Sequence, residues 1–210
     1  MDLTDSDMID NYDALTLGRY MKVNAVLDGP GDELDKQVQI LAILADLSTD
    51  EVLALPLADY ARMAAQSAFL RMPCKPAEIT EAYRFQDLQP MADFAKINTA
   101  QYIDFQTFAK DFPRSFPQLL SVFLVPEGHA YNTGYDVGKV QSQVGRIPFP
   151  EALGLAAFFF GRFLKLTEDS LTSWAEAASK EKDPARKEAM TARLTEVLGL
   201  LERAGLGLQM

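Results

Sequence analysis

Apolar residues recur every three or four positions along most of this 210-residue sequence, and proline and glycine interrupt the pattern at intervals. This spacing places the apolar side chains on one face of an α-helix, so each uninterrupted stretch predicts an amphipathic helix. Hydrophobic residues make up 48% of the chain, which is enough to build a core. We therefore expect a mainly α fold: a compact multi-helix domain with a small β-hairpin and a C-terminal helical hairpin.

Residues 15–72 are expected to form an N-terminal helical part. Thr16 can cap its first helix, and Gly29-Pro30-Gly31 then breaks the chain. Ser48 and Glu51 have the spacing of a capping box, in which each side chain bonds the other residue's backbone N–H. The expected helices span about 17–27, 32–47, 49–53 and 57–71, and the last is expected to bury Leu57, Tyr60, Met63, Ala64 and Phe69.

Residues 73–150 are expected to form a hairpin followed by helices. Two short extended stretches, 80–85 and 91–97, flank Asp87-Leu88-Gln89-Pro90, whose residues favour a turn. A helix at 77–83 is the alternative to the first of these strands. Thr99 can cap a helix of about 100–111, and further helices are expected at about 118–125 and 137–145. The apolar positions of the 100–111 helix are Tyr102, Ile103, Phe105, Phe108 and Phe112.

The two ends of the chain differ in character. Residues 1–14 carry five aspartates among few apolar residues, which predicts a solvated, disordered acidic tail. Residues 151–210 are expected to form a helical hairpin, whose first helix begins at Phe149 and whose second begins at Pro184. The best domain boundary is near residue 73, and one domain overall is favoured.

Composition excludes several functions. The formal net charge of −10 repels phosphate, so we expect no nucleic-acid binding. Cys74 is the only cysteine, which excludes an internal disulfide and a zinc site built on cysteines. The longest apolar stretch, about 152–164, is shorter than the roughly 20 residues that a membrane span needs. We therefore expect no membrane association.

No catalytic, cofactor or metal site is expected from the motifs. His129 is the only histidine, and no candidate nucleophile lies near it in the sequence, although a catalytic triad needs a base beside its nucleophile. The phosphate-binding patterns of P-loop and dinucleotide-binding proteins are absent. The less favoured alternative is a small-molecule-binding or enzymatic domain that uses loop 127–136, with His129, Tyr131 or Tyr135 lining a pocket.

Several segments, taken in order, resemble a family of small helical phage proteins. The best match is Thr99-Ala100-Gln101-Tyr102-Ile103-Asp104-Phe105, and Leu55-Pro56-Leu57 follows the capping box as it does in that family. The other segments that carry the likeness are 15–20, 40–44, 48–52, 120–126, 131–136, 150–154 and 157–160. Together they resemble the tail assembly chaperones of tailed bacteriophages and prophages, notably those of Bacteroidetes hosts.

This resemblance implies a non-enzymatic protein that acts in the host cytoplasm. It would bind the tape-measure protein or tail tube subunits, which expose apolar helical surface before they assemble. The alternative is a structural component of the virion, such as a neck, baseplate or internal protein. No cofactor is implied, and self-association is left open. The candidate partner-binding residues are Phe158, Phe159, Phe160, Phe163 and Trp174.

Overall fold

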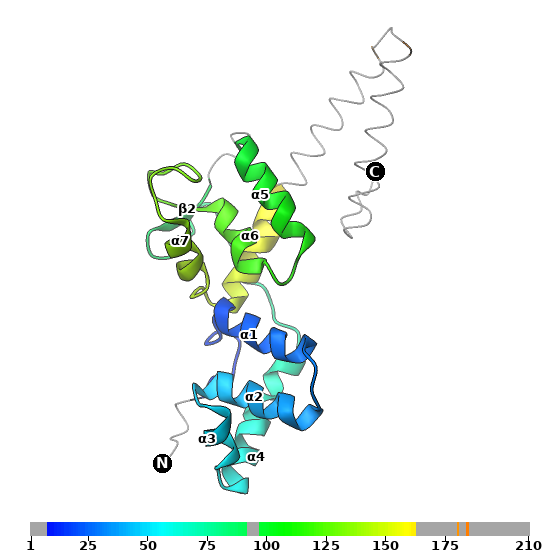
Figure 1. Ribbon diagram of the computed structural model, residues 1–210. Helices are drawn as coiled ribbons and strands as arrows, with labels where there is room; N and C mark the ends of the chain where they lie inside the picture. Colours follow the sequence, from blue (N-terminus) through cyan, green and yellow to red (C-terminus); the bar gives the residue numbers. More distant parts are fainter. Residues whose placement is uncertain (1–7, 92–96, 163–179, 181–183, 185–210) are drawn as a thin grey trace. The chain divides into compact units, whose positions relative to one another are not determined.

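The computed structural model describes residues 8–91, 97–162, 180 and 184 (Figure 1). The chain divides into two compact units, Met1–Asp93 with Ile97–Phe158 and Phe94–Lys96 with Phe159–Met210. Nearly all of the described residues belong to the first unit, which the following paragraphs concern. The predicted C-terminal helical hairpin lies mostly outside the described residues, apart from its first helical stretch.

The described residues are mainly helical and include a small two-stranded antiparallel sheet, as the sequence predicts. The N-terminal helices are α1 (Leu17–Asp28), α2 (Glu33–Ala45), α3 (Thr49–Leu53) and α4 (Leu57–Gln66), followed by the 3-10 helix η1 (Ser67–Arg71). The later elements are β1 (Leu88–Pro90), α5 (Thr99–Lys110), α6 (Phe116–Phe123), β2 (Leu124–Pro126), α7 (Val137–Val144) and a helix that covers residues 149–162.

The caps of the N-terminal helices form where the sequence predicts them. The Thr16 side chain accepts a hydrogen bond from the backbone N–H of Arg19 at the start of α1. At the start of α3, the Glu51 N–H donates to Ser48 Oγ (3.2 Å) and the Ser48 N–H donates to Glu51 Oε2 (2.7 Å). The predicted capping box is therefore confirmed, and it fixes the direction in which α3 leaves α2.

Helix α2 separates two apolar clusters. One cluster joins it to α3 and α4 and includes Val38, Leu41 and Met63, whereas the other joins it to α1 and includes Val23 and Leu44. The prediction for Met63 is thus confirmed, and Tyr60, Ala64 and Phe69 pack against the clusters half-buried. The prediction for Leu57 is wrong: its side chain is 82% exposed, because the first turn of α4 projects beyond α2 and α3.

The predicted disordered acidic tail can be compared with the structure only over residues 8–14. Residues 1–7 lie outside the described residues. Met8, Ile9 and Tyr12 pack against the cluster between α1 and α2, and the Ile9 N–H donates to the Leu44 carbonyl (3.2 Å). The prediction of a solvated tail is therefore wrong for residues 8–14, because apolar side chains between the aspartates contribute to the core.

The sheet forms at a different place from the predicted hairpin. Strand β1 pairs with β2, with Leu88 opposite Pro126 and Pro90 opposite Leu124. The expected turn residues are thus a strand, and its partner comes from beyond α6. The tight turn lies just before β1, where Phe85 and Leu88 bridge each other. Residues 77–83 form neither strand nor helix. The predicted turn at Leu88–Pro90 is wrong, because distant pairing places these residues in a strand and buries Leu88 completely. The second predicted strand, 91–97, lies mostly outside the described residues.

Helices α5 to α7 enclose a second part of the core. Helix α6 is almost entirely buried, because α5, α7 and β2 all pack against it. The N-cap of α5 is Asn98 rather than Thr99: its side chain accepts from the Gln101 N–H (2.8 Å). Among the predicted apolar positions of α5, Phe105 is buried and Phe108 half-buried. The remaining three, which were expected on the buried face, are exposed: Tyr102, Ile103 and Phe112.

Residues far apart in the sequence form a backbone seam between segments 15–18 and 145–149. The Leu17 N–H donates to the Ile147 carbonyl (2.8 Å), the Gly18 N–H donates to the Gly145 carbonyl (2.8 Å), and the Phe149 N–H donates to the Leu15 carbonyl (2.7 Å). The first two bonds satisfy the first N–H groups of α1, which have no partner within the helix, and the third satisfies the first N–H of the 149–162 helix. The seam also places the starts of α1 and of the 149–162 helix side by side.

An extended segment, residues 72–87, lies across the start of the 149–162 helix. The Ala77 N–H donates to the Pro150 carbonyl (2.9 Å), and the Tyr83 hydroxyl donates to Glu151 Oε2 (2.7 Å). The crossing is so close that a Cβ at Gly154 would overlap the Ala77 carbonyl oxygen. Glycine at position 154 is therefore required by the packing of this segment.

We expect Gly154→Ala to lower the free energy of unfolding by about 1–3 kcal/mol, because the held backbone of residue 77 cannot retreat from the added methyl group. Gly161→Ala is the matched control in the same helix, where a Cβ meets nothing within 4 Å. That variant should gain up to about 1 kcal/mol from helix propensity. Urea unfolding of both variants measures the difference, and equal effects would contradict the close crossing.

The capping box also predicts a lowered pKa for the Glu51 carboxyl. The bond from the Ser48 backbone N–H, and then the bond with the Ser48 hydroxyl, lower the pKa of Glu51 below its ordinary value. A carboxyl whose pKa is lower in the folded state stabilises the fold above its unfolded pKa, and this contribution is lost as pH falls. Carboxyl NMR titration should show the low pKa in the wild type and a partial rise in Ser48→Ala, which removes the hydroxyl bond and keeps the backbone N–H bond. An unchanged pKa in that variant would argue against the bond with the Ser48 hydroxyl.

Candidate protein-binding surfaces

Loop 127–136, the less favoured small-molecule site, contains His129. His129 is exposed, its Nδ1 lies 3.0 Å from the Glu127 carbonyl oxygen, and its ring meets Tyr135 edge-on at 5.9 Å between centroids. Within residues 8–91 and 97–162, no three histidine, cysteine or acidic side chains lie close enough together to hold a metal ion. The described contacts of His129 are therefore with the Glu127 carbonyl oxygen and the Tyr135 ring.

Tyr131 anchors this loop instead of lining an open pocket. Its side chain is 8% exposed, and its hydroxyl donates to Asp104 Oδ2 on α5 (2.7 Å). Burial raises the pKa of the Tyr131 hydroxyl, and the bond to the carboxylate raises it further, so the group stays protonated. The Tyr135 hydroxyl in turn accepts from the Asn132 N–H (3.1 Å), which stabilises the loop internally.

The predicted phenylalanine contacts are largely covered. Phe159 is only 3% exposed, and Phe158 and Phe160 are half-buried. The remaining candidates, Phe163 and Trp174, lie outside the described residues. Of the three consecutive rings, the middle one is thus a core side chain, and the other two can offer only part of their surface to a partner.

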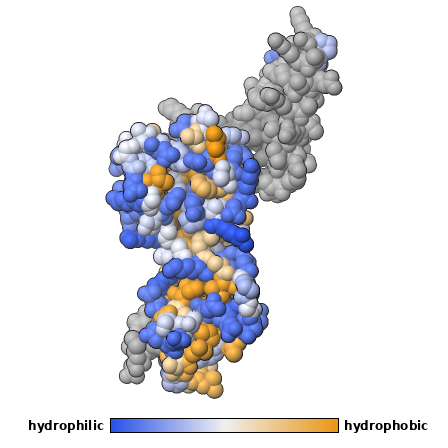
Figure 2. Space-filling model, viewed as in Figure 1, coloured by the Kyte–Doolittle hydropathy of each residue, from blue (hydrophilic) through white to orange (hydrophobic). Residues whose placement is uncertain are grey.

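The most exposed large apolar side chain of the described residues is Leu57, and it belongs to a contiguous apolar tip (residues 53–58). This segment reads Leu-Ala-Leu-Pro-Leu-Ala and carries no charge; five of its residues are exposed and Leu55 is half-buried. Leu53 and Leu57 are 68% and 82% exposed. Figure 2 shows hydrophobic residues on the surface formed by α3 and α4, where this tip lies.

Local structure explains why the tip faces outward. Helix α3 ends at Leu53, and Pro56 is already the N-cap of α4, so the turn between the two helices is very short. Val52 (1% exposed) points into the core, and its neighbour Leu53 therefore points away. Covering a fully exposed leucine is worth about 1.5–3 kcal/mol, so the tip is a surface on which a partner could gain binding energy.

Exposed apolar residues on α5 do not make a comparable surface. Tyr102 and Ile103 near the start of α5, and Phe112 just beyond its end, are each about half exposed, and exposed polar residues such as Thr107 and Lys110 lie between them. Contiguity distinguishes a binding patch from scattered apolar residues, which are normal on protein surfaces. The apolar tip is therefore the stronger candidate.

Sequence reasoning missed the tip because it assigned Leu57 to the buried face of a helix. The signal was nevertheless present in the sequence. Six uncharged, mostly apolar residues in a row cross a Pro56 break, and a chain that turns there cannot direct all of them into one core. The apolar residues of this segment that do not face the core must stay at the surface.

The chain matches no family model, no curated protein and no solved structure. In the described part of the chain, no helix is both long and apolar enough to cross a membrane. The likeness to phage tail assembly chaperones thus rests on the motifs of the sequence alone.

The anchoring role of Tyr131 can be tested. We expect Tyr131→Phe to lower the free energy of unfolding by about 1 kcal/mol or more, because it removes a hydrogen bond to a carboxylate. Asp104→Ala should cost a similar amount, and a double-mutant cycle in urea should show that the two losses are not additive. Tyr102→Phe is the control, because Tyr102 is exposed on α5, the helix that carries Asp104. It should change the free energy of unfolding little. Additive losses would contradict a direct bond.

Proposed function

We propose that this protein is a non-catalytic tail assembly chaperone of a bacteriophage or prophage. In this proposal it binds the tape-measure protein or tail tube subunits and covers their apolar helical surface before they polymerise. The proposal that the protein binds an apolar client rests on the exposed, uncharged tip at residues 53–58. The phage context comes from the sequence motifs, which include the capping box and the Leu55-Pro56-Leu57 step at this same place.

The tip has properties that suit a partner with an apolar helical face. Leu53 and Leu57 flank a proline turn, so they are held by two short helices and lose little freedom on binding. Removing both side chains from water supplies several kcal/mol by the usual estimate of about 25 cal/mol per Å². A binding site of this kind recognises surface character more than exact sequence, as a chaperone requires.

Charge supports the same function. The chain carries a formal net charge of −10, and Asp50 and Glu51 are exposed just before the tip. Net charge far from zero keeps a protein dispersed while it holds an apolar client. It also favours clients with basic residues beside their apolar face.

We expect the double variant Leu53→Ser, Leu57→Ser to lose most client capture without unfolding. Both side chains are exposed, so the melting temperature should fall by only a few degrees. Tagged wild type and variant would be expressed in the phage or prophage background, and the tape-measure and tube proteins recovered from induced lysates would be quantified by mass spectrometry. Leu27→Ser, at an exposed leucine of α1, is the matched control and should capture as the wild type does.

Purified particles from the same cultures separate the chaperone from a virion component. Capture of tape-measure or tube protein together with absence from particles supports the chaperone. Stoichiometric presence in particles would favour a neck, baseplate or internal protein. Equal capture by the double variant and the wild type would show that the tip is not the client surface.

A further inference from the structure

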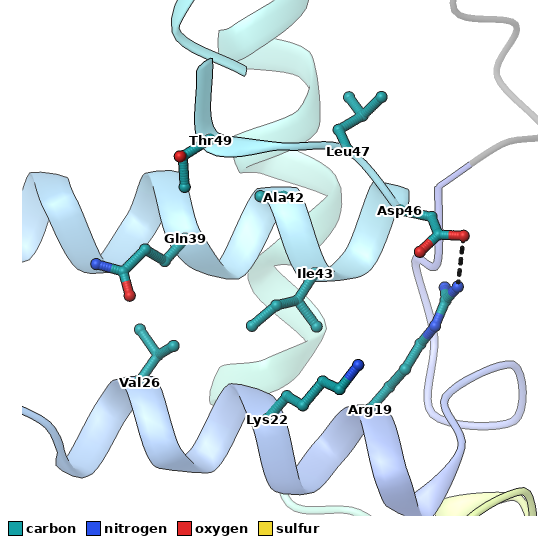
Figure 3. A pocket seen from close by; sticks show the side chains of 9 residues that line it. All are labelled: Arg19, Lys22, Val26, Gln39, Ala42, Ile43, Asp46, Leu47 and Thr49. Atoms are coloured by element: carbon teal, nitrogen blue, oxygen red, sulfur yellow. Dashed lines mark ion pairs between the residues drawn. The ribbon is translucent and has the colours of Figure 1, made fainter. Parts of the chain in front are cut away.

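A shallow groove lies over α2, bordered by α1 on one side and by Leu47 and Thr49, at the start of α3, on the other (Figure 3). None of its lining residues belongs to the apolar tip. It has a volume of about 320 Å³, and its apolar lining residues, which form its floor, are Val26, Ala42, Ile43 and Leu47. Figure 3 shows Val26 pointing from α1 toward α2 and Ile43 pointing from α2 toward α1. All of these floor residues except Ala42 are half-buried, so the floor is still partly open to water.

The two edges of the groove differ in charge. The α1 edge carries Arg19 and Lys22, whereas the α2 edge carries Gln39 and Asp46. Arg19 pairs with Asp46 at 3.4 Å across one end of the groove, as the dashed line in Figure 3 marks. Lys22 is exposed, and no carboxylate pairs with it in the part of the chain that the structure describes. A cationic edge beside an apolar floor is notable in a chain with 30 acidic and 20 basic residues.

The lining residues extend along a similar length of α1 and of α2. Residues 19, 22 and 26 follow one face of α1, and residues 39, 42, 43 and 46 follow one face of α2. Each set spans seven positions, which is about 10 Å or two helical turns at 1.5 Å per residue. Amphipathic helices commonly bind in such grooves through residues spaced three and four apart.

From this geometry we propose that the α1–α2 groove binds a short amphipathic helix of a partner protein, one that places leucine-like side chains on the floor and aspartate or glutamate beside Arg19 and Lys22. Charge complementarity selects an acidic edge over a basic one, because Lys22 gains a partner and Arg19 can share its guanidinium between Asp46 and the incoming carboxylate. This surface and its ligand are independent of the apolar tip and of the proposed chaperone function.

A designed peptide tests the proposal on the full-length protein. The probe is a synthetic helix-forming peptide of about 15 residues with leucines spaced three and four apart and glutamates along one edge. The matched peptide has lysine at every glutamate position. We expect the glutamate peptide to bind more tightly, to shift the NMR signals of Val26, Ile43 and Leu47, and to weaken as salt is raised.

Charge reversal in the protein provides the second arm. Lys22→Glu should weaken binding of the glutamate peptide by about fivefold or more and should improve binding of the lysine peptide. Lys139→Glu, at an exposed lysine of α7, makes the same charge change away from the groove and should leave both affinities unchanged. The variant with Leu53→Ser and Leu57→Ser should also bind the glutamate peptide as the wild type does, so failure of the tip and failure of the groove are distinguishable.

Three results would overturn the proposal. The first is equal or absent binding of the two peptides. The second is a set of NMR shifts that map to residues 53–58 in place of the groove. The third is concentration-dependent dimerisation that blocks the peptide and disappears in Lys22→Glu, which would assign the groove to a second copy of this chain.

Discussion

The backbone seam between residues 15–18 and 145–149 is the interaction on which the described fold depends. The first N–H groups of a helix must find acceptors outside that helix. In α1 they find the carbonyls of Ile147 and Gly145, and the Phe149 N–H returns a bond to Leu15. A Cβ at position 18 would come within 2.9 Å of the Gly145 oxygen, so glycine allows the two backbones to approach. The seam joins the α1–α4 helices to the elements that follow.

Around this seam, core formation determines what remains at the surface. Helix α2 uses one side for α3 and α4 and another for α1, and it leaves its groove face only half covered. Helix α6 is enclosed by its neighbours, so the apolar residues of α5 that do not reach it stay exposed. The apolar tip remains because the α3–α4 turn is too short to fold both Leu53 and Leu57 back onto α2. Both candidate surfaces therefore contain apolar residues that the packing of the core leaves uncovered.

The two surfaces differ in charge. The tip at residues 53–58 is uncharged and follows two exposed acidic residues, whereas the α1–α2 groove joins an apolar floor to Arg19 and Lys22. A protein with both could hold an apolar client at one surface and a second, acidic helix at the other. The two surfaces share no residue, because the tip consists of residues 53–58, whereas the groove is lined by residues of α1, of α2 and of the start of α3.

The sequence by itself determined that the chain is mainly helical and where α1 and α3 start, because caps such as Thr16 and the Ser48–Glu51 box act within one turn of the chain. It also determined that Pro56 breaks an apolar run. Only the tertiary structure decided the pairing of β1 with β2, the packing of Met8 and Ile9 against α2, and the outward direction of Leu57. Helical spacing indicates that a side chain can be buried, but burial needs a partner surface, and that surface is supplied by residues distant in the sequence.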